Sequence, residues 1–135
     1  MDIVIDTNIL IAALLRDNKI RELIVNSKDR LLVPEVIYQE IKEHKEELLN
    51  KSELSEEEFD TLMSKLGGYL TIVSNKKLVN FQKEAELIIG NIDKNDVLII
   101  AASLTNNNCP IWSDDNHFLK QKSIQIFKTQ DMIEK

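Results

Sequence analysis

Acidic side chains stand at the points of this sequence where predicted strands end and predicted helices begin. The aspartates in such positions are Asp6, Asp93, Asp96, Asp114 and Asp115. Like charges that lie close together raise one another's pKa, and a group of carboxylates becomes favourable when cations lie among them. Hard divalent cations prefer oxygen ligands of this kind. The sequence therefore predicts a metal site, with Mg²⁺ or Mn²⁺ as the cofactor.

An all-oxygen site for such a cation suits the hydrolysis of phosphoryl and phosphodiester bonds. The other common chemistries lack their parts in this chain. Its three glycines cannot build a Gly-x-Gly-x-x-Gly motif or a P-loop, and its two histidines are too few for a typical zinc hydrolase. The Gly-x-Ser-x-Gly elbow of serine hydrolases is also missing. Cleavage of a phosphate ester is thus the predicted class of reaction.

Short apolar runs alternate with stretches of helical periodicity along the whole chain. The strand-like runs lie at residues 3–5, 31–33, 69–73, 110–112 and 124–127. Helices are expected between them, at residues 9–15, 20–25, 34–48, 55–66, 75–89 and 93–102. Strands that alternate with helices predict a parallel sheet with helices on both faces. We therefore expect one domain over residues 1–135, an α/β protein built as a three-layer α/β/α sandwich around a central, mostly parallel sheet.

The predicted sheet gives a reason for distant acids to meet. Ligands of open parallel sheets collect at the carboxyl ends of the strands. Asp6 ends the first strand, and Asp115 follows the strand at residues 110–112. Asp96 lies in the first turn of a buried helix, and Glu40 lies within about two turns of the start of the helix after the second strand. These four acids are expected at one edge of the sheet.

Composition limits the setting of this chemistry. The net charge is −6, from 17 Lys and Arg against 23 Asp and Glu, so the chain lacks the basic surface of many nucleic-acid binders. Bound cations would offset that charge at the site. Apolar runs such as residues 97–102 are too short to span a bilayer, and no membrane contact is expected. The lone cysteine, Cys109, fits a reducing compartment, so we expect a cytoplasmic protein.

Four segments resemble the motifs of the PIN-domain ribonuclease family. They are IVIDTNIL at residues 3–10, VPEVIYQEI at residues 33–41, DKNDVLIIAA at residues 93–102 and IWSDDNHF at residues 111–118. Each motif alone is weak, but their order and spacing match the family over nearly the whole chain. Ser113 stands where threonine is common in that family, and it keeps the hydroxyl group.

The resemblance implies a metal-dependent endoribonuclease that hydrolyses RNA with Mg²⁺ or Mn²⁺. The acids it carries over, as metal ligands and catalytic residues, are Asp6, Glu40, Asp96 and Asp115. Asp93 is a further candidate ligand that equally suits the cap of a helix, and Asp114 is expected to be exposed rather than ligating. The family also implies the toxin of a VapBC-type toxin–antitoxin pair, with an antitoxin partner and a homodimer.

Residues around the acids have less specific interpretations. Asn8 is expected to orient an aspartate through hydrogen bonds, and Thr7 and Ser113 either do the same or cap helices. The candidates for weak contacts to RNA phosphates are Arg16, Lys42, Lys45 and Lys94, with ordinary solvated surface as the alternative interpretation. His44 and His117 are expected to face solvent, and Trp112 is expected to lie in the core rather than to stack on a base. The apolar stripe at residues 59–66 is expected to pack on its own domain.

Two other functions stay open at this point. A PIN-like domain without catalysis would only bind RNA or a protein, but here all the acidic positions are filled. Another Mg²⁺-dependent phosphoryl hydrolase, such as a phosphatase, would use the same cofactor. The Asp-x-Asp motif of aspartyl phosphatases is absent after the first strand, where the chain reads Asp6-Thr7-Asn8. Cleavage of RNA is therefore the leading hypothesis.

Overall fold

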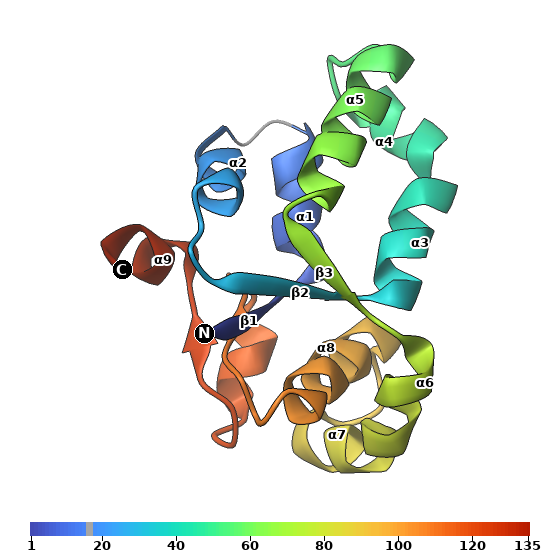
Figure 1. Cartoon of the computed structure of the whole chain (residues 1–135). Helices are drawn as coiled ribbons and strands as arrows, with labels where there is room; N and C mark the ends of the chain where they lie inside the picture. The colour runs from blue at the N-terminus through green and yellow to red at the C-terminus, as the bar shows by residue number, and fades with distance from the viewer. Residues whose placement is uncertain (16–17) are drawn as a thin grey trace.

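Strands and helices alternate along the chain, which Figure 1 shows in colour from one end to the other. The computed structural model describes residues 1–15 and 18–135. The strands are β1 (Asp2–Ile5), β2 (Arg30–Pro34), β3 (Leu70–Val73), β4 (Ile111–Trp112) and β5 (Ile126–Phe127). The α-helices are α1 (Thr7–Leu15), α2 (Asn18–Val25), α3 (Glu35–Glu43), α4 (Lys45–Lys51), α5 (Glu56–Gly67), α6 (Asn75–Leu78), α7 (Gln82–Ile89), α8 (Lys94–Thr105) and α9 (Thr129–Glu134). Short 3₁₀ helices are η1 (Val79–Phe81) and η2 (Asn116–Lys120).

The strands form a five-stranded sheet in the order β3-β2-β1-β4-β5, and each neighbouring pair is parallel. The chain first moves outward from β1 through β2 to β3, and then returns to place β4 on the other side of β1. The strand order therefore reverses between β1 and β4. In open α/β sheets a ligand crevice forms at this kind of reversal, at the carboxyl ends of the strands.

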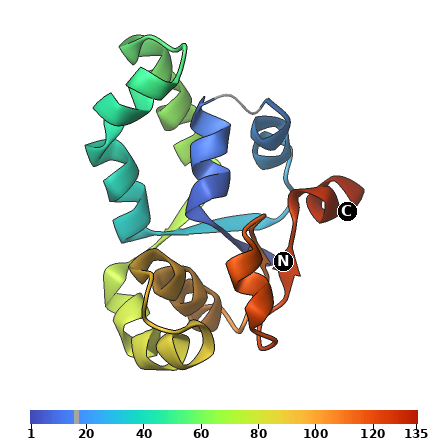
Figure 2. The same ribbon diagram turned by 180° about the vertical axis from the view of Figure 1, so that it is seen from behind.

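Helices cover both faces of the sheet. In Figure 1, α1 to α5 lie on one side of the strands and α6, α7 and α8 on the other. Figure 2 shows the same two helical layers from behind. The predicted three-layer α/β/α sandwich with a parallel central sheet is thereby confirmed.

Part of the core lies between β1 and α8. Ile3, Val4 and Ile5 of β1 are all buried, so the wholly apolar run belongs to a strand covered on both faces. The helix α8 contacts β1, β2 and α7, and buried residues occupy most of its length. The apolar residues of α8 surround the helix instead of forming one stripe, because the helix is buried between the sheet and α7. This packing fixes the first turn of α8 beside the end of β1.

Helix boundaries differ from those that the sequence predicts. One helix is predicted over residues 34–48, but the path bends at His44 and forms α3 and α4. Leu48 of α4 is buried in the core, like Ile41 of α3. The helix predicted over residues 75–89 is divided into α6, η1 and α7. The apolar stripe of α5 packs on its own domain, as expected. In the described part of the chain, no helix has the length and apolar character needed to span a membrane.

Candidate active site

Asp6 lies directly after β1, at the reversal of the strand order. Its backbone N–H donates to the carbonyl oxygen of Trp112 at 3.0 Å, which continues the pairing of β1 with β4. The residue is only 5% exposed. Burial is the main cause that raises the pKa of the Asp6 carboxyl, and the charges of Asp115 and Asp93 add to it. A hydrogen bond from Ser113 acts in the opposite direction and favours the charged form.

Ser113 links Asp6, the acid that follows β1, to Asp115, the acid that follows β4. Its hydroxyl donates to Oδ2 of Asp6 at 2.7 Å and accepts the backbone N–H of Asp115 at 3.0 Å. The carboxylate of Asp115 in turn accepts the N–H of His117 at 2.9 Å and caps η2. Through these two hydrogen bonds, the turn after β4 holds the carboxylates of Asp6 and Asp115 near each other.

The third carboxylate is that of Asp96, which belongs to the helical layer of α6, α7 and α8. It lies in the first turn of α8, with its side chain 14% exposed. Burial, the largest cause, and the charges of Asp93, Asp6 and Asp115 together raise the pKa of Asp96 to about 6. Asp93 is the cap of α8, because its side chain accepts the N–H groups of Asn95 and Asp96. We call Asp6, Asp96 and Asp115, with Asp93 beside them, the acidic centre.

His117 belongs to this centre, which the sequence does not predict. Its side chain is largely exposed, in line with the solvent-facing position expected of it. However, Nδ1 lies 3.7 Å from Oδ2 of Asp96 and 3.6 Å from Oδ1 of Asp115. The sequence feature that could have indicated this position is that His117 lies only two residues after Asp115.

Glu40 stands apart from the acidic centre. In the described part of the chain, no hydrogen bond or ion pair joins its carboxylate to the aspartates. It lines a hollow of about 310 Å³ together with Thr7 and Asn95, the neighbours in sequence of Asp6 and Asp96. The hydroxyl of Thr7 is buried and has no hydrogen-bond partner among the described residues. Glu40 thus shares a hollow with the sequence neighbours of Asp6 and Asp96, but not with these aspartates themselves.

Asp114 and Trp112 do not take part in the centre. The carboxylate of Asp114 accepts the backbone N–H of Thr129 at 2.8 Å and its hydroxyl at 2.6 Å, so it holds the start of α9. Trp112 is fully buried, and its Nε1 donates to the same hydroxyl at 3.0 Å. Trp112 is a core residue, and stacking on a base is excluded for it.

The basic residues that the sequence proposes for RNA binding occupy different environments. Nζ of Lys45 lies 2.9 Å from Glu56 and 2.7 Å from Asp60, so its charge is paired. Nζ of Lys42 lies 4.9 Å from the ring centre of Tyr38. Lys94 is exposed at the start of α8. Arg16 lies outside the described residues. Asn8 is exposed, and no hydrogen bond from its side chain is found among the described residues.

The chemistry of the acidic centre fits a divalent cation, although the side chains are not yet at ligand distances. No group of three or more His, Cys, Asp or Glu residues in the described part of the chain is arranged to hold a metal ion as it stands. Burial and mutual repulsion both disfavour the charged forms of Asp6 and Asp96. A cation would remove that repulsion, and carboxylate oxygens are the ligands that Mg²⁺ and Mn²⁺ prefer. The unpartnered hydroxyl of Thr7 offers one more polar group beside it.

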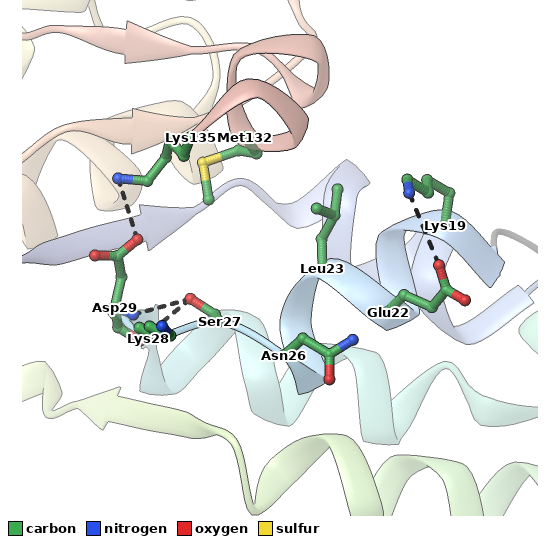
Figure 3. A pocket seen from close by; sticks show the side chains of 9 residues that line it. All are labelled: Lys19, Glu22, Leu23, Asn26, Ser27, Lys28, Asp29, Met132 and Lys135. Carbon is green, nitrogen blue, oxygen red and sulfur yellow. Dashed lines mark hydrogen bonds and ion pairs between the residues drawn. The ribbon is translucent and has the colours of Figure 1, made fainter.

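A hollow elsewhere on the molecule has no comparable chemistry. It has a volume of about 520 Å³ and lies between α2 and α9, near the amino end of β2 (Figure 3). Its charged side chains are largely paired: Lys135 with Asp29 at 3.2 Å, and Lys19 with Glu22 at 3.9 Å. The acidic centre lies at the opposite, carboxyl end of the strands.

Comparison with known proteins agrees with this architecture. The PIN domain family matches residues 4–133. Solved structures of similar fold include VapBC2 from Rickettsia felis bound to a DNA fragment from their promoter, at 16% identity and a TM-score of 0.70, covering 95% of this chain and 98% of that chain. They also include VapBC-1 from nontypeable Haemophilus influenzae, at 17% identity and a TM-score of 0.69, covering 96% and 99%. No curated protein matches the chain significantly in sequence.

Proposed function

The chain belongs to the PIN-domain family, a family of nucleases, and we propose that it is a divalent-metal-dependent endoribonuclease. The observation that carries this proposal is the meeting of Asp6, Asp96 and Asp115 at the reversal of the strand order. These residues come from the position after β1, from α8 and from the turn after β4, and the charges of Asp6 and Asp115 act on the ionisation of Asp96. Only a site that uses cations or positive charge benefits from such a cluster.

Asp6, Asp96 and Asp115 would hold Mg²⁺ or Mn²⁺, with Glu40 approaching from the hollow beside Thr7 and with Asp93 as a further ligand candidate. When bound, such a cation supplies Lewis-acid activation of water and of the scissile phosphate. Ser113 keeps Asp6 in a fixed orientation and holds the backbone of Asp115 at the same time. Asp93 secures the first turn of α8, so that Asp96 stays at the centre.

RNA is the proposed substrate, on the resemblance of the motifs to the PIN-domain ribonucleases. The net charge of −6 does not favour a nucleic acid by itself. Cations at the acidic centre would reverse the charge where the scissile phosphate binds. Of the basic residues proposed for phosphate contacts, Lys42 and Lys94 are exposed, whereas the charge of Lys45 is taken up by Glu56 and Asp60.

We further propose that the protein is the toxin of a toxin–antitoxin pair, located in the cytoplasm, and that it forms a homodimer. The two structures of similar fold named above are VapBC proteins, which supports an antitoxin partner for this chain. An arginine from such a partner would pair with the carboxylates of the acidic centre in bidentate fashion and compete with the cation. Cys109 is a buried free thiol, which fits a reducing compartment. Light scattering at micromolar concentration tests the homodimer.

The central experiment incubates the purified protein with a panel of structured and single-stranded RNAs in Mn²⁺, Mg²⁺ or EDTA, and maps the ends of the products. We expect internal cuts that require the cation and that disappear in Asp6→Asn. Single-stranded DNA and a phosphomonoester serve as controls for the other functions. Cleavage of the monoester alone would replace the proposal by a phosphatase. Binding of RNA without any cut would replace it by a non-catalytic binding domain.

A further inference from the structure

A second hollow, of about 230 Å³, adjoins the acidic centre between the end of α7 and η2. It shares Asp93, Asp96 and His117 with that centre. The remaining lining residues differ in character from the acids: they are Ile88, Ile89, Ile92 and Lys120. We call the three isoleucines the isoleucine wall. Apolar side chains, the positively charged Lys120 and two carboxylates of the acidic centre thus line the same hollow.

Ile92 is the most unusual member of the isoleucine wall. Its side chain is 100% exposed, so it gains nothing from burial in the folded chain. Its position is nevertheless well defined by the chain on both sides. Gly90, at a φ of +86°, ends α7 with its N–H on the carbonyl oxygen of Glu86, and Asp93 caps α8 immediately afterwards. The fold therefore holds an exposed apolar side chain beside the acidic centre.

Lys120 supplies the opposite charge in the same hollow. It lies at the end of η2, is exposed, and forms no ion pair with any of the residues that the structure describes. A free ammonium group beside an apolar wall complements a ligand that carries both an apolar ring and a phosphate. A nucleotide has both parts. In single-stranded RNA the bases are unpaired and can leave the stack to meet protein side chains.

We propose that this hollow binds the base of a nucleotide next to the scissile phosphate in single-stranded RNA, and that the isoleucine wall thereby determines the sequence that is cut. The proposal rests on the ribonuclease activity proposed above, because it assigns the substrate of the same centre. The isoleucine wall packs against the face of the base. Lys120 forms an ion pair with the neighbouring phosphate that lies on the side away from the acidic centre. Asp93 and Asp96 line the side of the hollow that adjoins the acidic centre. The scissile phosphate would lie on that side of the bound nucleotide.

Binding can be tested separately from cleavage. The full chain, labelled with ¹³C at the isoleucine δ1 methyl groups, is titrated in Mg²⁺ with each of the nucleoside 5′-monophosphates. These ligands have no phosphodiester bond, so they cannot be cut. We expect the methyl signals of Ile88, Ile89 and Ile92 to shift, more for one base than for the others. Ribose 5-phosphate, which lacks a base, should leave them in place, and the exposed Ile72 of the outer strand β3 serves as an internal control.

Specificity is tested with single-stranded oligoribonucleotides that differ only at the nucleotide beside the cut. Ile92→Ala should reduce the ratio of kcat/KM between the best and the worst base by about tenfold, the effect of losing a few methylene contacts. Leu87→Ala is the matched control, because Leu87 is 88% exposed on the adjoining helix and does not line the hollow. That variant should keep the base preference of the unmodified chain.

The outcomes separate this proposal from the ribonuclease proposal. If RNA is cut while the isoleucine signals stay silent and Ile92→Ala keeps the base preference, the base site is overturned and the ribonuclease stands. If the signals shift with nucleotides but no RNA is cut, the nucleotide site stands and the ribonuclease fails. Shifts that depend on protein concentration without nucleotide, and vanish in Ile92→Ala, would show that a second copy covers the wall, which also overturns the proposal.

Discussion

The hydroxyl of Ser113 lies 2.7 Å from Oδ2 of Asp6, although 107 residues separate the two in the chain. The contact joins the turn after β4 to the end of β1, and both residues are buried. Since the same hydroxyl accepts the backbone N–H of Asp115, one side chain sets the spacing between two carboxylates of the acidic centre. A short polar side chain at this position thus acts on the site through its neighbours.

Replacing Ser113 by alanine removes the donor and leaves a buried carboxylate without this hydrogen bond. We expect the rate of RNA cleavage to fall by about 10- to 100-fold, as for other groups that orient metal ligands. The free energy of unfolding should fall by about 1–3 kcal/mol at neutral pH. Cleavage assays in Mn²⁺ and urea denaturation measure the two effects on the same preparations.

Ser113→Thr is the matched control for this prediction, because it keeps the hydroxyl while adding a methyl group. It should recover most of the cleavage that Ser113→Ala loses, even if the added methyl costs some stability in a buried site. A Ser113→Ala protein that cleaves RNA at the original rate, while Asp6→Asn is inactive, would show that Ser113 does not orient the site.

Neutral replacements of the acids test the centre itself. Asp6→Asn and Asp96→Asn keep the shape of the side chain but remove a charged oxygen ligand. We expect cleavage to fall by orders of magnitude while circular dichroism stays unchanged. Asp114→Asn is the control, since Asp114 is the neighbour of Asp115 but binds Thr129. Equal losses in Asp114→Asn and in Asp96→Asn would contradict the assignment of the acids.

Cation binding should also appear in the stability of the protein. A cation that binds only the folded state raises the melting temperature by mass action. We expect millimolar Mn²⁺ or Mg²⁺ to raise Tm relative to EDTA, and the effect to be lost in Asp6→Asn. Scanning calorimetry of both proteins at equal ionic strength measures it. An unmodified chain whose Tm does not respond to Mn²⁺ would rule out appreciable binding under those conditions.

Much of the acidic centre can be predicted from the sequence, because its acids lie at boundaries that have local signals. Asp6 follows an apolar run, and Asp93 lies three residues before Asp96 at the start of an apolar helix. The parallel sheet then brings such boundaries to one edge. The hydrogen bond between Ser113 and Asp6 is less accessible to sequence reasoning, since it depends on the register of β4 against β1.

Contacts between side chains of distant elements are the part that the sequence does not supply. Lys45 loses its expected role at a phosphate because α4 and α5 bring it to Glu56 and Asp60. The hollow beside Ile92 depends on how α7 ends and on where η2 lies, and neither has a periodic signal.

The pH dependence of stability provides a test of Asp96 that needs no substrate. Its folded-state pKa is about 6, above the ordinary value of 3.8, so the folded protein holds the proton more tightly than the unfolded chain. Without metal, the contribution of Asp96 to stability is therefore most favourable below pH 4 and declines as the pH rises through 6. Burial raises the pKa of Asp6 as well, which acts in the same direction, whereas the lowered pKa of Glu58 acts in the opposite one. The informative quantity is thus the difference in the free energy of unfolding between the unmodified chain and Asp96→Asn.

In EDTA, we expect Asp96→Asn to be more stable than the unmodified chain by about 1–2 kcal/mol at pH 7.5. This is less than the full pKa shift implies, because the centre is partly open to solvent. This advantage should shrink towards pH 4 and be reduced by Mn²⁺, which stabilises only the unmodified centre. Urea denaturation across this range measures it, and an advantage that is the same at every pH would contradict the raised pKa of Asp96.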